Sequence, residues 1–192
     1  MPSKTIDPIT LEVMRSALYS IADEMIAALV RTSYSTNIKD RRDASCAVYA
    51  PDGSLVAQSA VGTPLHLGTM NWAVHTAMEA YPFDELEPGD ALAFNLPYPA
   101  GPGHLNDLTL ISPVFHREEI VAIVANQAHH VDMGGFAPGS MPFGVSEIYQ
   151  EGLQIPPVRL FRKGQLVDEL WRTIQQNVRS KTEVQGDLMA QF

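Results

Sequence analysis

Three histidines and two aspartates lie close together in the middle of the sequence, among glycines and prolines. His104 and Asp107 stand three residues apart at the start of an apolar run, and His129 stands at the end of the next such run. Imidazole nitrogens and carboxylate oxygens are typical ligands of divalent transition metals. These residue types therefore indicate a metal-dependent enzyme, or a piece of one, more than a simple binding module.

The two apolar runs, 107–115 and 119–126, are expected to pair as a β-hairpin. The ends of a hairpin that are remote from its turn lie together, which brings His104, Asp107 and His129 close to one another. Two histidines and one carboxylate leave ligand positions open for water or substrate, as a catalytic metal requires. The alternative is that these polar groups only satisfy loop backbone, as Asx turns do.

Three further residues are candidates for proton transfer. His130 points elsewhere if its neighbour points inward, so it either orients a ligand or lies at the surface. His66 stands between two leucines, which favours a core histidine, with a site residue as the alternative. Glu151, four residues after Glu147, is placed to act as a general base or simply to lie on a solvated face.

The composition excludes several classes of function. A net charge of −9 and a pI near 5.0 disfavour a nucleic-acid partner and an anionic membrane surface. The single cysteine, Cys46, excludes an intrachain disulfide and is expected to be a buried, inert thiol. No run approaches the roughly 20 apolar residues of a membrane span, so a cytoplasmic location is the expectation. Glycine-rich phosphate-binding motifs are absent from the sequence, so any ATP is bound by other means.

The first half of the chain predicts two helices and a hairpin. Asp7-Pro8 begins a helix that reaches about Arg31 and carries an apolar stripe wide enough to be well buried. Two strand-like runs, 45–50 and 54–59, flank a Pro-Asp-Gly turn. Residues 63–68 are expected to form a loop, followed by a second helix that Thr69 or Asn71 caps and that ends near Ala80.

The second half predicts short strands, a long loop and a final helix. The expected elements are a strand at 91–94, the 107–126 hairpin, a Gly/Pro-rich loop at 134–157, a strand at 158–161 and a helix at 168–178. The charged residues 40–43 favour mutual ion pairs over an anion clamp. Together the elements predict an α+β fold with a largely antiparallel sheet in one domain, residues 1–192.

Seven ordered segments resemble the hydantoinase B/oxoprolinase family, which includes subunits of N-methylhydantoinase, 5-oxoprolinase and acetone and acetophenone carboxylases. The segments begin at Asp7 (DPITLEV), Lys39 (KDRRDASC), Pro64 (PLHLG), Gly103 (GHLND), Ala128 (AHHVDMGG), Glu151 (EGLQIPPV) and Asn177 (NVR, continuing to GDL at Gly186). They cover essentially the whole chain. The resemblance implies that an A-type partner subunit uses ATP to phosphorylate a carbonyl or carboxyl oxygen, and that a chain of this type then processes the activated intermediate.

The resemblance also implies a ligand set. In acetone carboxylase the related subunit holds a divalent metal through a histidine, an aspartate three residues later and a second histidine, and those positions match His104, Asp107 and His129. Zn, Mn or Fe is therefore expected here. The family usually reads Asn-Asp-Pro-Tyr ahead of the metal histidine, whereas this chain has Leu96 in place of that aspartate, followed by an unusually proline-rich loop.

The expected function is thus the N-terminal, metal-bearing portion of an ATP-dependent cyclic-amide hydrolase subunit, acting on a small cyclic amide. Family members are much longer, so the remainder is expected either as further sequence or as a separate chain. Two alternatives stay open: a subunit of an ATP-dependent ketone carboxylase, and a non-catalytic scaffold or assembly subunit.

Overall fold

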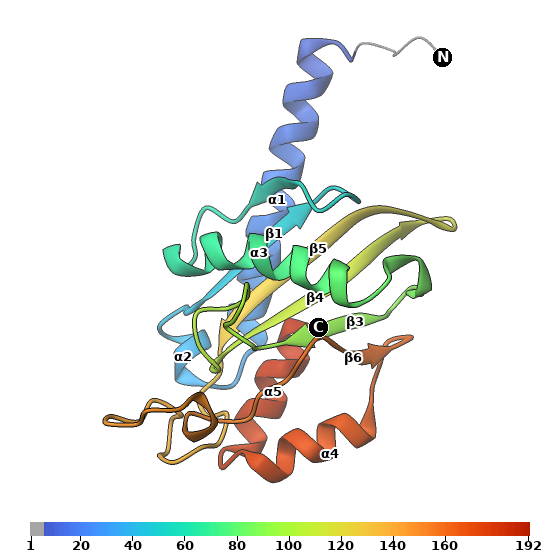
Figure 1. Ribbon diagram of the computed structural model, residues 1–192. Helices are drawn as coiled ribbons and strands as arrows, with labels where there is room; N and C mark the ends of the chain where they lie inside the picture. The colour runs from blue at the N-terminus through green and yellow to red at the C-terminus, as the bar shows by residue number, and fades with distance from the viewer. Residues whose placement is uncertain (1–5) are drawn as a thin grey trace.

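The computed structural model describes residues 6–192 and is built on one antiparallel sheet of seven strands, in the order β2-β1-β5-β4-β3-β6-β7 (Figure 1). The strands are β1 (Ala44–Tyr49), β2 (Leu55–Gln58), β3 (Ala91–Phe94), β4 (Asp107–His116), β5 (Glu119–His129), β6 (Val158–Arg162) and β7 (Gln165–Leu166). The helices are α1 (Pro8–Thr32), α2 (Thr36–Lys39), α3 (Pro64–Ala80), α4 (Asp168–Asn177) and α5 (Lys181–Gln191), with 3-10 turns η1 (Phe83–Glu85) and η2 (Ile148–Gln150). The predicted α+β class with a largely antiparallel sheet is confirmed.

Both predicted hairpins are present. In the central one, β4 pairs with β5 from Asp107 opposite His129 to His116 opposite Glu119. In the other, β1 pairs with β2 across the Pro51-Asp52-Gly53 turn. The two hairpins join through β1 and β5, where Ala44 lies opposite Ala128. This pairing completes the centre of the sheet.

Side chains alternate between two covered faces of the sheet, as the pleat requires. Ala47 and Tyr49 of β1 pack with α3 on one face, whereas Cys46 packs with α1 on the other. The predicted burial of Cys46 is confirmed, with 1% of its surface exposed. On the α1 side, α4 and α5 also cover the sheet through a core that includes Trp171 and Leu188 (Figure 1).

Helix α1 begins and ends close to the predicted residues, but its predicted burial is wrong. Asp7 caps the helix by accepting hydrogen bonds from the N–H groups of Ile9 and Thr10, and Pro8 occupies the first helical position. Its first half stands clear of the sheet, so that Ile9 is 78% exposed and Val13 64% exposed (Figure 1). Periodicity identifies an apolar stripe but not whether a neighbour covers it.

Helix α3 corrects a second prediction. Residues 63–68 do not form a loop; the helix begins at Pro64, and its N-cap lies six residues before the earlier of the two predicted N-caps. Thr63 takes the N-cap position and Pro64 the first helical position, where a missing N–H costs nothing. His66 therefore lies in the first turn of a helix.

The C-terminal part contains one helix that was not predicted. Helix α5 follows α4 and ends against the sheet, where Phe192 stacks on Phe161 with ring centroids 4.0 Å apart. Asp187 of α5 accepts hydrogen bonds from the N–H groups of Tyr34 and Ser35, which ties α5 to the segment after α1. The predicted loop at 134–157 is confirmed and contains only η2. None of the helices in the described part of the chain combines the length and apolar character that a membrane crossing requires.

Candidate metal centre

The predicted hairpin brings the three predicted metal ligands together. Asp107 is the first residue of β4 and His129 the last of β5, and the two are directly opposite in the register. His104 lies three residues before the start of β4, in a turn where its own carbonyl accepts the N–H of Asp107. The candidate ligand atoms of these three side chains all lie within 4.8 Å of one another.

The carboxylate of Asp107 is the centre of this cluster. Its Oδ1 lies 3.0 Å from Nε2 of His104, 3.2 Å from Nδ1 of His129 and 3.5 Å from Nε2 of His66. The residue is 1% exposed, and its second oxygen, Oδ2, is buried without a hydrogen-bond partner. Three imidazole nitrogens therefore converge on one buried carboxylate.

This convergence sets the charge of the centre. Burial of the Asp107 carboxyl raises its pKa, but the imidazole hydrogen bonds outweigh burial and hold the pKa well below its usual range. Asp107 is therefore ionised at neutral pH. The hydrogen bond to Asp107 raises the pKa of His104, although partial burial opposes the shift. The rings of His104 and His129 lie 4.7 Å apart and tilted by 41°.

His66, predicted as a possible site residue, is brought into the centre by the first turn of α3. Its side chain is 2% exposed, and its Nδ1 is buried without a partner.

Asp43, which was predicted to form ion pairs with its neighbours in 40–43, also lies here. Its carboxylate lies 3.9 Å from both His66 and His129 and accepts a hydrogen bond of 2.6 Å from the hydroxyl of Thr63. Asp43 directly precedes β1 and lies an even number of residues from Ala47, so the alternation of the strand places both side chains on the α3 face. This alternation was the signal in the sequence that could have indicated the face on which Asp43 lies.

The structure places Glu151 near the centre and half-buried, directly after η2. Its charge contributes to the raised pKa of His104. The backbone of Glu151 comes so close to Gly135 that a Cβ there would collide with it, and the carbonyl of Asn177 comes equally close to Gly134; both glycines have positive φ. The paired glycines therefore serve close backbone approach.

His130 lies on the opposite face of the sheet. It is 0% exposed, and its Nε2 lies 2.7 Å from Oε1 of Gln191 in α5. Burial lowers the pKa of His130. Asp132 is also buried and binds Arg179 at 3.2 Å. Neither residue joins the metal centre.

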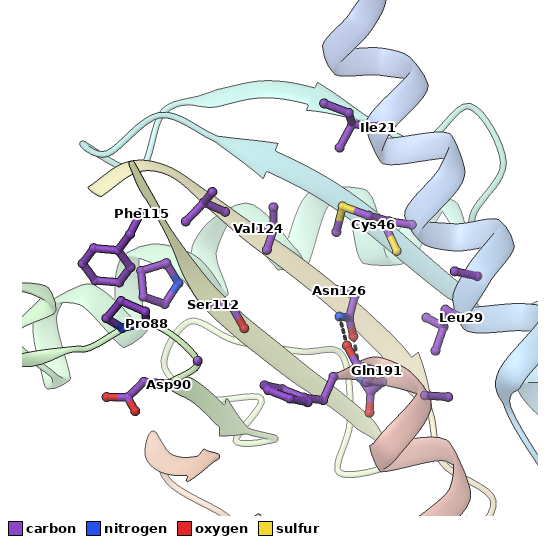
Figure 2. A pocket seen from close by; sticks show the side chains of 17 residues that line it. Ile21, Leu29, Cys46, Pro88, Asp90, Ser112, Phe115, Val124, Asn126 and Gln191 are labelled. Atoms are coloured by element: carbon purple, nitrogen blue, oxygen red, sulfur yellow. Dashed lines mark hydrogen bonds between the residues drawn. The ribbon is translucent and has the colours of Figure 1, made fainter. Parts of the chain in front are cut away.

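A cavity of about 620 Å³ lies on the α1 side of the sheet, the face opposite to His104, Asp107 and His129 (Figure 2). Two of its polar residues, Asn126 and Gln191, hydrogen-bond each other, with Gln191 Nε2 donating to Asn126 Oδ1 at 2.9 Å; Asp90 and Ser112 also line it. The rest of the lining is largely apolar, including Ile21, Leu29 and Val124. This trough has the character of a packing surface rather than of a reaction site.

The side chains present fit a divalent transition metal. Two imidazoles and one ionised carboxylate offer the donor types such an ion prefers. A buried carboxylate oxygen without a partner is unusual in a protein, and a cation bound at this position would satisfy it. His66 and Asp43 lie where they can orient the ligands.

The family model named hydantoinase B/oxoprolinase matches residues 7–192. The chain belongs to this family. It is 47% identical over 189 residues to an uncharacterised protein of Methanocaldococcus jannaschii, covering 97% of this chain and 33% of that protein. It is 42% identical to the 5-oxoprolinase of Dictyostelium discoideum, covering 99% of this chain and 15% of that protein. The B-type subunit of a putative D-/L-hydantoinase from a Pseudomonas species is 32% identical, covering 98% of this chain and 32% of that protein.

Two solved structures are similar. The ATP-dependent caprolactamase of Pseudomonas jessenii has a TM-score of 0.85 and 34% identity, covering 98% of this chain and 32% of that one. The nucleotide-free acetone carboxylase has a TM-score of 0.82 over 96% of this chain, and at 22% identity it shows the shared fold alone. This family member thus spans about a third or less of the length of the relatives it matches.

Proposed function

We propose that this chain is the metal-bearing, N-terminal domain of an ATP-dependent cyclic-amide hydrolase of the hydantoinase/oxoprolinase type. The observation that carries the proposal is the convergence of His104, Asp107 and His129 at the open end of the central hairpin. The relatives named as a 5-oxoprolinase, a putative hydantoinase and a caprolactamase support the amide-hydrolase class. A cytoplasmic location stays a prediction.

In this proposal the three residues hold one divalent ion, Zn, Mn or Fe. Such an ion supplies Lewis acidity that polarises a carbonyl and lowers the pKa of water. Asp107 is the anionic ligand, since its pKa lies below the usual range. His66 and Asp43 position the ligands, with Asp43 fixed by Thr63. Glu151, next to the centre, is the group we assign to proton transfer, and we assign none to His130 because it lies against α5.

Metal analysis of purified variants tests the centre. We expect the wild type to retain close to one equivalent of divalent metal and His104→Ala to lose most of it. His116→Ala is the matched control, because His116 is exposed at the opposite end of β4. Equal metal content in all three proteins would remove the site as described.

The proposed partners are an A-type subunit that uses ATP and a polypeptide equivalent to the rest of the longer relatives. The apolar trough supports this proposal, since it is lined by half-exposed side chains such as Ile21 (Figure 2). ATP-coupled turnover is expected only after co-expression with both partners. Full turnover by the isolated 192-residue chain would contradict it.

The same assembly separates hydrolase from carboxylase. A hydrolase needs activated substrate and water, so bicarbonate should not change ATP turnover with a panel of lactams. A carboxylase consumes bicarbonate, so its ATP turnover with ketones should depend on it. Ketone turnover that strictly requires bicarbonate would replace the hydrolase proposal with the carboxylase. An assembly that binds its partners but turns over neither substrate class would indicate a scaffold.

A further inference from the structure

An apolar hollow of about 560 Å³ lies between the first turns of α3 and the proline-rich loop before β4. Its lining comes from two stretches of the chain. The first turns of α3 contribute Leu65, Thr69 and Trp72, and the loop 97–103 contributes its prolines and Gly103. Prolines fix φ, so the loop wall is stiff. The hollow is therefore a preformed apolar surface.

The hollow adjoins the metal centre on both of its walls. Leu65 directly precedes His66, and Gly103 directly precedes His104. A Cβ placed on Gly103 would lie 3.3 Å from Oδ2 of Asp107 and 3.1 Å from Leu65. The unpartnered carboxylate oxygen thus lies close to Gly103 in the wall of the hollow, so a ring seated in the hollow would lie beside the centre.

The lining is selective in its chemistry. None of its residues, all in the described part of the chain, is charged. The hydroxyl of Thr69 is already engaged by backbone carbonyls and by Gln127. Trp72 is 60% exposed and offers a large apolar ring. A ligand carboxylate seated against this lining would lose water and find no cationic side chain in it, which is costly.

We infer that this hollow is the ring-binding subsite of the centre, and that it takes uncharged aliphatic cyclic amides in preference to cyclic amides that carry a carboxylate. Trp72 and the proline loop are the specificity-determining surfaces. The cyclic-amide class rests on the proposed function, whereas the preference for an uncharged ring rests on the lining itself.

Tryptophan fluorescence tests the inference without requiring turnover. The chain has two tryptophans, and Trp171 lies in the core, 7% exposed. In a Trp171→Phe variant Trp72 is the sole reporter. The probes are caprolactam, 2-pyrrolidone and 5-oxoproline, of which the last two share a five-membered lactam and differ by one carboxylate. We expect saturable signal changes with the two uncharged lactams and at least about tenfold weaker binding of 5-oxoproline.

Ligand-observed NMR on the wild type and Trp72→Ala repeats the measurement without the core substitution. Trp72→Ala should weaken caprolactam binding by about tenfold, and an exposed side chain can be removed without unfolding the protein. No saturable response to either uncharged lactam would overturn the inference, as would equal affinity for 5-oxoproline. Burial of Trp72 by a partner protein, with no lactam effect, would make the hollow a protein interface instead.

The outcomes distinguish this inference from the proposed function. Lactam binding at Trp72 without hydrolysis by the full assembly would support the subsite and defeat the hydrolase. Hydrolysis of lactams that is indifferent to Trp72→Ala would support the hydrolase and defeat the subsite.

Discussion

Asn95 connects the loop that carries His104 to the segment that follows Glu151, and its removal should be strongly destabilising. Its Nδ2 donates to the carbonyls of Leu105 at 2.8 Å and Leu153 at 2.9 Å, and its Oδ1 accepts the N–H of Ile155 at 2.7 Å. The side chain is fully buried. Asn95→Ala leaves three backbone groups without partners, at about 1–2 kcal/mol each, so we expect a loss of roughly 3–6 kcal/mol.

Urea unfolding measures this loss. With an m-value of about 2 kcal/mol/M, the midpoint should fall by roughly 1.5–3 M. Asn177→Ala is the matched control, because its Nδ2 makes one exposed hydrogen bond within α4 and its loss should change stability by under about 0.5 kcal/mol. Asn95→Asp should also destabilise, since a carboxylate would face two carbonyl oxygens. An Asn95→Ala protein within about 0.5 kcal/mol of the wild type would refute the reasoning.

Three further changes test burial, backbone approach and helix docking. Burial raises the pKa of Cys46 to about 12, so at pH 8 the thiol stays protonated; iodoacetamide should label it only after denaturation, as followed by mass spectrometry. Gly135→Ala should destabilise by about 1–3 kcal/mol, since φ is +80° and the new Cβ would meet the backbone of Glu151; an unchanged melting temperature would contradict this. Asp187→Ala should lower the free energy of unfolding by about 2–4 kcal/mol, as urea unfolding would measure, because the N–H groups of Tyr34 and Ser35 lose their acceptor. Asp168→Ala, at an exposed position of α4, should not have this effect.

The central hairpin could be predicted from the sequence because its signals are local. Two β-branched runs and a short turn define the pairing, and a period of two places residues on alternate faces. The prediction that His130 points away from His129 followed from that rule and is what the structure has. The same reasoning brought together His104 and Asp107.

Two of the features that were missed depend on contacts between distant segments. The third, the start of α3, has a local signal in the sequence that the prediction overlooked. Asp43 reaches the centre only because β1 pairs with β5, about 80 residues later, and no local pattern encodes that partner. The exposure of α1 depends on which elements cover its stripe. The start of α3 was readable, since Thr63-Pro64 is an N-cap followed by a first-position proline.

The adjacent pair His129-His130 makes the register of β5 decisive for the site. A shift of one residue would turn His129 toward α5 and aim His130 at Asp107. Contacts on the far face oppose that shift, since His130 and Asn126 both bind Gln191. The one irregularity in the β4–β5 pairing lies between Val114 and Phe115, near the turn, so the ladder is regular from there to the centre. The α5 side of the sheet thus fixes the geometry of the centre on the α3 side.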